Sequence, residues 1–127
     1  MIIDSDVLIW YLRGNESARV VVESTVPFSI SVVTYMEIMQ GMKNKIEMRI
    51  FQKQIQAWNI DIIQIDKEIS SRAMFYVQEY ALSHAMTLAD ALIAATVVQG
   101  GETLLTANEK HYKFIPTIDI RRYIPKD

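Results

Sequence analysis

A short apolar run that ends in a pair of nearby carboxylates opens the chain. Three apolar residues precede Asp4 and Asp6, and the apolar pattern resumes at Val7. If residues 1–4 form a buried strand, Asp4 lies at its carboxyl end, the edge of an open α/β sheet where ligands bind. A carboxylate buried there needs a cation or hydrogen-bond donors to compensate for its lost hydration. The N-terminus therefore predicts a polar site at one edge of a sheet.

The apolar pattern along the rest of the chain predicts alternating strands and helices. The expected strands are residues 1–4, 28–32, 60–65, 103–106 and 115–120. The expected helices are residues 5–12 with Ser5 as the N-cap, 16–24, 34–42, 45–58, 67–83 and 87–98, with a turn or short helix over 107–112 and a partly frayed tail over 121–127. This α/β alternation implies a mostly parallel sheet of four to five strands with helices on both faces.

Length and composition predict one globular domain over residues 1–127. Half of the residues are apolar and 22% are charged, which is ordinary for a globular protein. The absence of cysteine excludes disulfides and zinc–thiolate sites, and it fits a cytoplasmic location. A net charge of −2 gives no overall attraction to nucleic acid, but it leaves room for a nuclease that neutralises phosphate with a metal. No apolar run is long enough to span a bilayer, and no signal peptide is expected.

Three acids occupy equivalent places in this scheme. Asp4 ends the first strand, Glu37 lies one turn into the helix after the second strand, and Asp90 lies one turn into an alanine-rich helix. Helices that follow strands begin at the carboxyl edge, so Asp4 and Glu37 are expected to be neighbours. Asp90 follows a helix, and periodicity alone does not place it. A simpler interpretation is capping, because Thr34 and Thr87 each stand three residues before an acid and Asp4 directly precedes a helix.

If the three carboxylates lie close together, capping alone does not explain their arrangement. Their mutual repulsion raises pKa values unless a cation intervenes. Carboxylate oxygens favour Mg²⁺ or Mn²⁺, and the chain has no cysteine for a softer metal. Such a metal lowers the pKa of a bound water and neutralises charge on a phosphoryl group. That is the chemistry of phosphodiester hydrolysis.

Four stretches resemble, in order, the motifs of the PIN-domain family. They are residues 2–9, 29–41, 88–96 and 104–112. Their order and spacing agree over nearly the whole chain, and within the family they are similar to the VapC-type toxins of toxin–antitoxin pairs. The resemblance implies a three-layer α/β/α sandwich.

The resemblance also implies a Mg²⁺- or Mn²⁺-dependent endoribonuclease that acts as a toxin. By this resemblance Asp4, Glu37 and Asp90 are the catalytic residues and metal ligands, and a metal-activated water cuts RNA. The implied supporting residues beside the metal or substrate are Ser5, Thr106 and Asn108. The implied partners are a second copy of the chain, in a dimer or higher oligomer, and a small antitoxin whose tail blocks the site.

Two supporting positions depart from the usual family pattern. Many members carry an acid where this chain has His111, whose imidazole could bind metal, contact phosphate or simply cap a short helix at the surface. Glu109 is the nearest acid, but it lies two residues early and is expected to face elsewhere. Asp6 stands where the family often has Asn, so we expect a supporting role rather than a metal ligand.

Two other functions stay open at this point. Asp4-Ser5-Asp6 also resembles the start of haloacid-dehalogenase-type phosphatases, with Asp4 as the nucleophile, but Glu37 and Asp90 would then be unexplained. A non-catalytic PIN-like domain that binds RNA or protein rests on His111 alone. One group of cations either binds RNA or antitoxin or forms a solvated surface: Arg13, Lys43, Lys45, Arg49 and Lys53.

Overall fold

The computed structural model describes residues 1–126 and contains the expected alternation of strands and helices. The strands are β1 (Ile2–Ile3), β2 (Ser29–Ser31), β3 (Asp61–Ile63), β4 (Thr103–Thr106) and β5 (Asp119–Arg122). The helices are α1 (Ser5–Leu12), α2 (Glu16–Thr25), α3 (Val32–Gln40), α4 (Lys45–Ala57), α5 (Lys67–His84), α6 (Leu88–Gln99) and the 3-10 helix η1 (Glu109–His111). Within residues 1–126, no helix has both the length and the apolar character needed to cross a membrane.

The strands form one sheet in the order β3-β2-β1-β4-β5, and every neighbouring pair is parallel. From β1 at the centre, the chain runs outward to β2 and β3 on one side, and β4 and β5 lie on the other. The strand order therefore reverses beside β1, at the kind of switch point where α/β sheets bind ligands. The polar residues that end β1 and β4 meet there.

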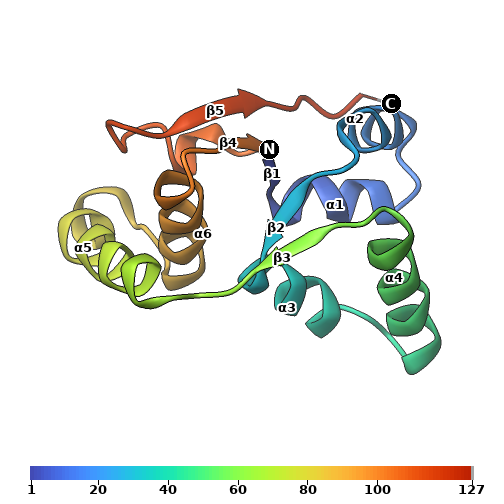
Figure 1. Ribbon diagram of the computed structural model, residues 1–127. Coiled ribbons are helices and arrows are strands. Elements are labelled where there is room, and N and C mark those ends of the chain that lie inside the picture. The colour runs from blue at the N-terminus through green and yellow to red at the C-terminus, as the bar shows by residue number, and fades with distance from the viewer. Residues whose placement is uncertain (127) are drawn as a thin grey trace.

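Helices cover both faces of the sheet, which confirms the expected three-layer sandwich. In Figure 1, α1 to α4 lie on one side of the sheet and α5 and α6 on the other. Side chains alternate along β1, so that Ile2 packs in the core beneath α5 and α6 and Ile3 packs in the core beneath α1 and α2. Both are fully buried. Helix α6 is buried on most of its surface, and its alanines let it approach the sheet closely.

Most element boundaries differ from the sequence prediction by one or two residues, and two of the differences have a clear physical cause. Helix α3 begins at Val32 rather than residue 34, because Ser31 caps it by accepting a hydrogen bond from the Val33 amide. The last strand lies at residues 119–122 rather than 115–120, because Pro116 has no N–H and falls in the preceding turns. The prediction of a partly frayed tail is therefore wrong for residues 121–123: Arg121 and Arg122 belong to β5, and Tyr123 is buried. Residue 127 of that tail lies outside the described residues.

Candidate active site at the carboxyl edge of the sheet

Asp4 is buried at the end of β1 and is held from two directions. Its Oδ1 atom accepts a hydrogen bond from the Ser5 amide at 2.8 Å, and its Oδ2 atom accepts one from the Thr106 hydroxyl at 2.9 Å. Asp4, and not Ser5, is therefore the N-cap of α1. Only 6% of its surface is exposed, and this burial, together with the charge of Asp6, raises its pKa to about 7. The donors Thr106 and Ser5 oppose that rise.

Asp6 ties α1 to the segment that follows β4. Its Oδ2 atom accepts hydrogen bonds from the Ala107 amide at 3.1 Å and from the Asn108 side-chain amide at 2.9 Å, with the Thr106 hydroxyl at 3.4 Å. Burial raises the pKa of Asp6 as well. The Asp6 carboxylate thus accepts its hydrogen bonds from within the protein, an arrangement that suits a supporting residue.

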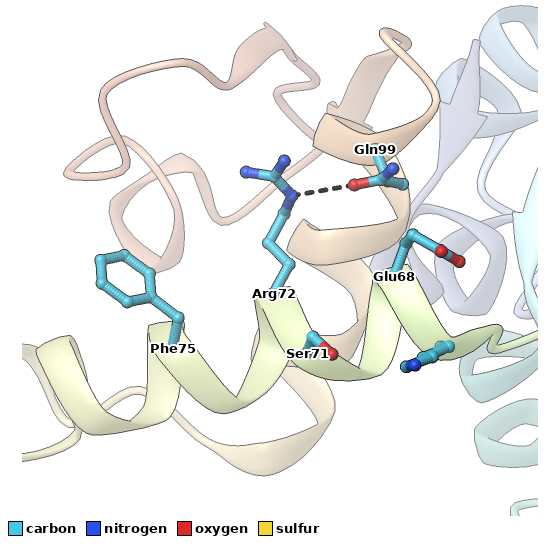
Figure 2. Close-up of a pocket in the computed structure, with 6 residues that line it drawn as sticks. Glu68, Ser71, Arg72, Phe75 and Gln99 are labelled. Carbon is cyan, nitrogen blue, oxygen red and sulfur yellow. Dashed lines mark hydrogen bonds between the residues drawn. The ribbon is translucent and has the colours of Figure 1, made fainter.

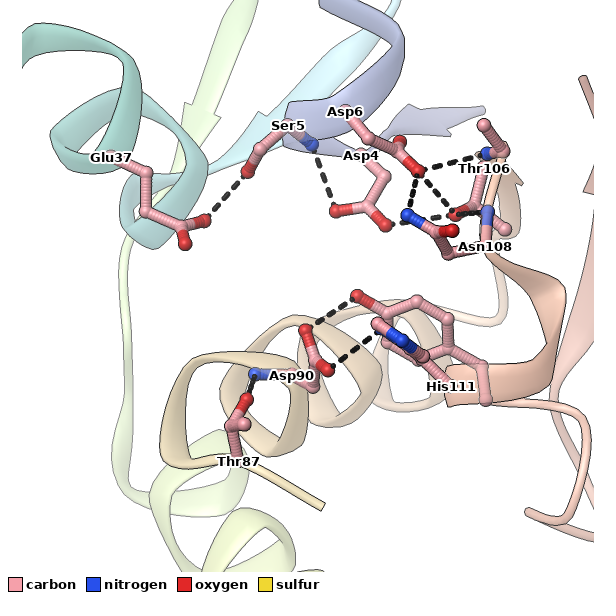
Figure 3. Close-up of polar contacts among 11 residues, drawn as sticks. Asp4, Ser5, Asp6, Glu37, Thr87, Asp90, Thr106, Asn108 and His111 are labelled. Atoms are coloured by element: carbon pink, nitrogen blue, oxygen red, sulfur yellow. Dashed lines mark hydrogen bonds and ion pairs between the residues drawn. The ribbon is translucent and has the colours of Figure 1, made fainter. Parts of the chain in front are cut away.

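Ser5 connects the first acid to the second. Its hydroxyl donates to Glu37 Oε1 at 2.6 Å and lies 3.3 Å from the Thr34 hydroxyl. Because α3 is capped by Ser31, Thr34 is buried inside the helix and does not cap it. The capping-box interpretation of Glu37 is therefore wrong. The Glu37 side chain is exposed and turns toward Ser5 instead (Figure 3).

Asp90 arrives at the same edge from the first turn of α6. Thr87 caps this helix as predicted, by accepting a hydrogen bond from the Asp90 amide at 3.2 Å. The Asp90 carboxylate plays no part in the cap. Its Oδ1 atom accepts a hydrogen bond from the Tyr112 hydroxyl at 3.1 Å, and its Oδ2 atom lies 3.3 Å from Nδ1 of His111. His111 therefore faces Asp90, and 46% of its side chain is exposed.

Two neighbours of His111 complete the segment after β4. Glu109 points away from the carboxylates and forms an ion pair with Arg122 at 3.5 Å, as its spacing predicted. Tyr112 is buried, and its hydroxyl faces both Asp90 and Asp4. Burial and the charges of these two acids raise the pKa of Tyr112, which keeps its proton. Tyr112 was not among the site residues predicted from the sequence, although it closes the fourth motif-like stretch, residues 104–112.

The three predicted acids surround one space. Figure 3 shows the side chains of Asp4, Glu37 and Asp90 facing the region between α1, α3 and α6. No group of three acidic or histidine side chains in residues 1–126 forms a ready-made metal site. Glu37 contacts Ser5, and Asp90 contacts Tyr112 and His111. The donor set nevertheless fits Mg²⁺ or Mn²⁺: three carboxylates, one of them buried without a cation.

Two surface hollows differ in their relation to this space. A groove of about 440 Å³ includes Glu37 and is lined by apolar residues together with Arg13, Lys43 and a second acid, Glu47. A hollow of about 490 Å³ lies between α5 and the end of α6, where Arg72 donates to the Gln99 side chain at 3.2 Å (Figure 2). Gln99 ends α6, whereas Asp90 lies in its first turn, so this second hollow lies away from the carboxylates.

Known proteins share both the sequence pattern and the fold. The family model for the PIN domain matches residues 1–115. A chain in a toxin–antitoxin complex from Klebsiella pneumoniae is 30% identical, with a TM-score of 0.75 over 92% of this chain and 93% of that chain. A chain of VapBC2 from Rickettsia felis, solved with a fragment of promoter DNA, is 17% identical, with a TM-score of 0.80 over 97% and 98%. FitAcB from Neisseria gonorrhoeae is 21% identical, with a TM-score of 0.71 over 94% of each chain. No curated protein sequence matches significantly.

Proposed function

The chain belongs to the PIN-domain family, and we propose that it is a Mg²⁺- or Mn²⁺-dependent endoribonuclease acting as the toxin of a toxin–antitoxin pair. The observation that carries this proposal is the arrangement of Asp4, Glu37 and Asp90 around one space at the carboxyl edge of the sheet. A different residue holds each of the three carboxylates in the fold. The stability of the fold therefore does not require them to lie around the same space.

Asp4, Glu37 and Asp90 would hold the cation, and the other residues would orient these three. The bound metal would supply a water of lowered pKa and would offset negative charge on the phosphate. Ser5 directs Glu37, Thr106 directs Asp4, and Asp6 holds Asn108 beside them. A divalent cation would also satisfy the buried Asp4, whose charged form has no cation partner among the described residues.

The groove beside Glu37 supports RNA as the substrate. Arg13 and Lys43 are exposed along it, and neither forms an ion pair within residues 1–126. Two free cations next to a carboxylate site can bind phosphates on either side of the bond that is cut, although the net charge of the whole chain is −2. The apolar residues that line the same groove, among them Leu12 and Met42, can contact a base.

The proposed partners are a small antitoxin and a second copy of this chain, in the cytoplasm. An antitoxin is proposed because the 30% identical chain belongs to a toxin–antitoxin complex. A homodimer is supported by exposed apolar side chains on α5 and α6, among them Met74, which is 61% exposed, and Leu88, which is 70% exposed. Leu88 lies two residues before Asp90, so a dimer joined there would place the two sites near each other.

The test compares the wild-type protein with Asp90→Asn on structured RNA, with Mg²⁺ or with EDTA. Wild type with Mg²⁺ should cut the RNA internally, and both the substitution and the chelator should abolish cutting. Arg72→Ala is the matched control, because Arg72 is on α5 and contacts Gln99, at the end of α6 away from Asp90, so this variant should cut like wild type. Equal cleavage by Asp90→Asn, or cleavage that survives EDTA, would refute the metal mechanism.

The same experiment separates the two alternative functions. A phosphatase with Asp4 as nucleophile would release phosphate from a monoester and leave the RNA chain intact. That alternative is disfavoured by Asp4 itself, because both of its oxygens accept hydrogen bonds and only 6% of its surface is exposed. A non-catalytic PIN domain would bind RNA equally well in all four conditions and cut it in none.

A further inference from the structure

Tyr112 places a buried hydroxyl group against Asp90, one of the proposed metal ligands. The residue follows η1 and is 1% exposed, and its ring belongs to the core that also contains Ala91 and Ile115. A buried tyrosine hydroxyl needs a polar partner. Here the partner is the Asp90 carboxylate, whose Oδ1 atom accepts the hydrogen bond at 3.1 Å. The ring thus fixes the hydroxyl in the core, and the hydroxyl fixes one oxygen of Asp90.

Asp4 and Asp90 differ in how firmly residues other than Tyr112 hold them. Asp4 accepts hydrogen bonds from the Ser5 amide and the Thr106 hydroxyl, both of which are buried. Asp90 is only half buried, and its other contact is His111, which is largely exposed at 46% and lies 3.3 Å away. The buried hydroxyl of Tyr112 is therefore the one rigid donor to Asp90 among the described residues.

Such a donor would set the geometry of the metal site. Asp90 comes from α6 and Asp4 from the end of β1, so nothing in the local chain fixes their relative position. We propose that Tyr112 is a positioning residue: its hydroxyl donates to Asp90 and holds that carboxylate facing Asp4, so that a divalent cation meets two ligands already in place. This inference rests on the proposed function. Groups that orient metal ligands typically contribute ten- to a hundredfold to metal affinity.

The test is the affinity of RNA-free protein for Mn²⁺, measured by calorimetric titration at pH 7.5. Tyr112→Phe removes the hydroxyl and keeps the ring, and it should weaken Mn²⁺ binding about tenfold or more. Tyr123→Phe is the matched control: Tyr123 is also buried, and its hydroxyl donates to Asn15 at 3.0 Å, away from the acids. That variant should bind Mn²⁺ like wild type, even if its melting temperature falls.

The outcomes separate this inference from the proposed function. Mn²⁺ affinity of Tyr112→Phe equal to that of wild type, or an equal loss in both variants, would refute the positioning role alone. A wild-type protein that binds no Mn²⁺ would refute both proposals.

A second measurement decides the matter if Tyr112→Phe does not fold. With 3-fluorotyrosine in place of tyrosine, the ¹⁹F signal of residue 112 should shift on addition of Mg²⁺ in the wild-type chain and stay in place in Asp90→Asn. A wild-type signal that does not move at saturating Mg²⁺ would overturn the inference.

Discussion

The two halves of the proposed site are built differently. The inner half comprises Asp4, Asp6, Thr106 and Asn108, which come from β1, α1 and the end of β4 and bond to one another. The outer half comprises Glu37, Asp90 and His111, which are exposed or half buried and make few contacts. The inner half is already assembled without a metal, at the cost of a raised pKa at Asp4.

This difference indicates which half the protein fixes and which half a cation would complete. Neighbouring parallel strands bring the inner residues together, because the β1–β4 pairing fixes the distance between Asp4 and Thr106. The outer residues depend on the packing of α3, α6 and η1, and on single hydrogen bonds. Substitutions in the inner half should therefore change both stability and activity, whereas substitutions in the outer half should change activity alone.

The largest effect is expected for Asp4→Asn. Loss of a central ligand should reduce RNA cleavage on the order of a hundredfold or more, measured in single turnovers with Mg²⁺. The same substitution should change how stability depends on pH. Because the folded-state pKa of Asp4 is raised from 3.8 to about 7, its protonated form is favoured in the fold. Metal-free wild-type protein should therefore be more stable at pH 4 than at pH 8.

For each protein, the free energy of unfolding is compared between pH values. The change in stability that Asn itself causes is the same at every pH and does not affect this comparison. The loss from Asp4 should develop as pH rises from about 4 through about 7, and should amount to a few kcal/mol in the free energy of unfolding. Asp4→Asn should flatten this slope, and Mg²⁺ should restore stability at pH 8 in wild type only. An equally steep slope in Asp4→Asn would show that the inner half does not carry an unpaired charge.

Asp6→Ala tests the inner half without touching a proposed ligand. It leaves the Ala107 amide and the Asn108 side chain without their acceptor, and should lower the free energy of unfolding by about 1–3 kcal/mol. Urea denaturation measures the change. Asp6→Asn keeps one acceptor oxygen and should lose less. If both variants match wild type, the inner half is not held together by Asp6.

Removal of the groove cations should weaken RNA binding without affecting the metal site. Arg13→Ala with Lys43→Ala, in an Asp90→Asn background that does not cut, should reduce the salt dependence of binding to single-stranded RNA. Each lost phosphate contact should lower the slope of log K against log salt by about 0.7. Fluorescence anisotropy over a series of salt concentrations measures the slope. Arg49→Ala, on α4 outside the groove, is the control and should leave it unchanged.

The smallest effect is expected for His111→Ala. Its contact with Asp90 is largely exposed and screened by water, so cleavage should fall less than in Tyr112→Phe and by less than about tenfold. Cleavage rates of the two variants, measured side by side at Mg²⁺ concentrations below saturation, test this ranking. A loss as large as that of Asp90→Asn would instead assign His111 a direct part in the reaction.

Much of the fold followed from local patterns. The alternation of apolar residues predicted the helices and strands, and the position of Asp4 at the end of β1 followed from them. The start of α3 did not, because Ser31 and Thr34 are both good caps and only the strand pairing of β2 decides between them. The last strand was placed too early for a similar reason: Pro116 shows only that the strand is interrupted, and the pairing with β4 fixes it at residues 119–122.

In the candidate site, too, some features follow from the local sequence and others from tertiary packing. By itself the sequence determined the three acids, and it placed Asp4 and Glu37 at one edge, because both follow strands of a parallel sheet. Only the tertiary structure brought Asp90 to that edge and put Tyr112 and His111 against its carboxylate. Those contacts depend on how α6 and η1 pack in the core. Such packing joins residues far apart in sequence, so no local periodicity encodes it.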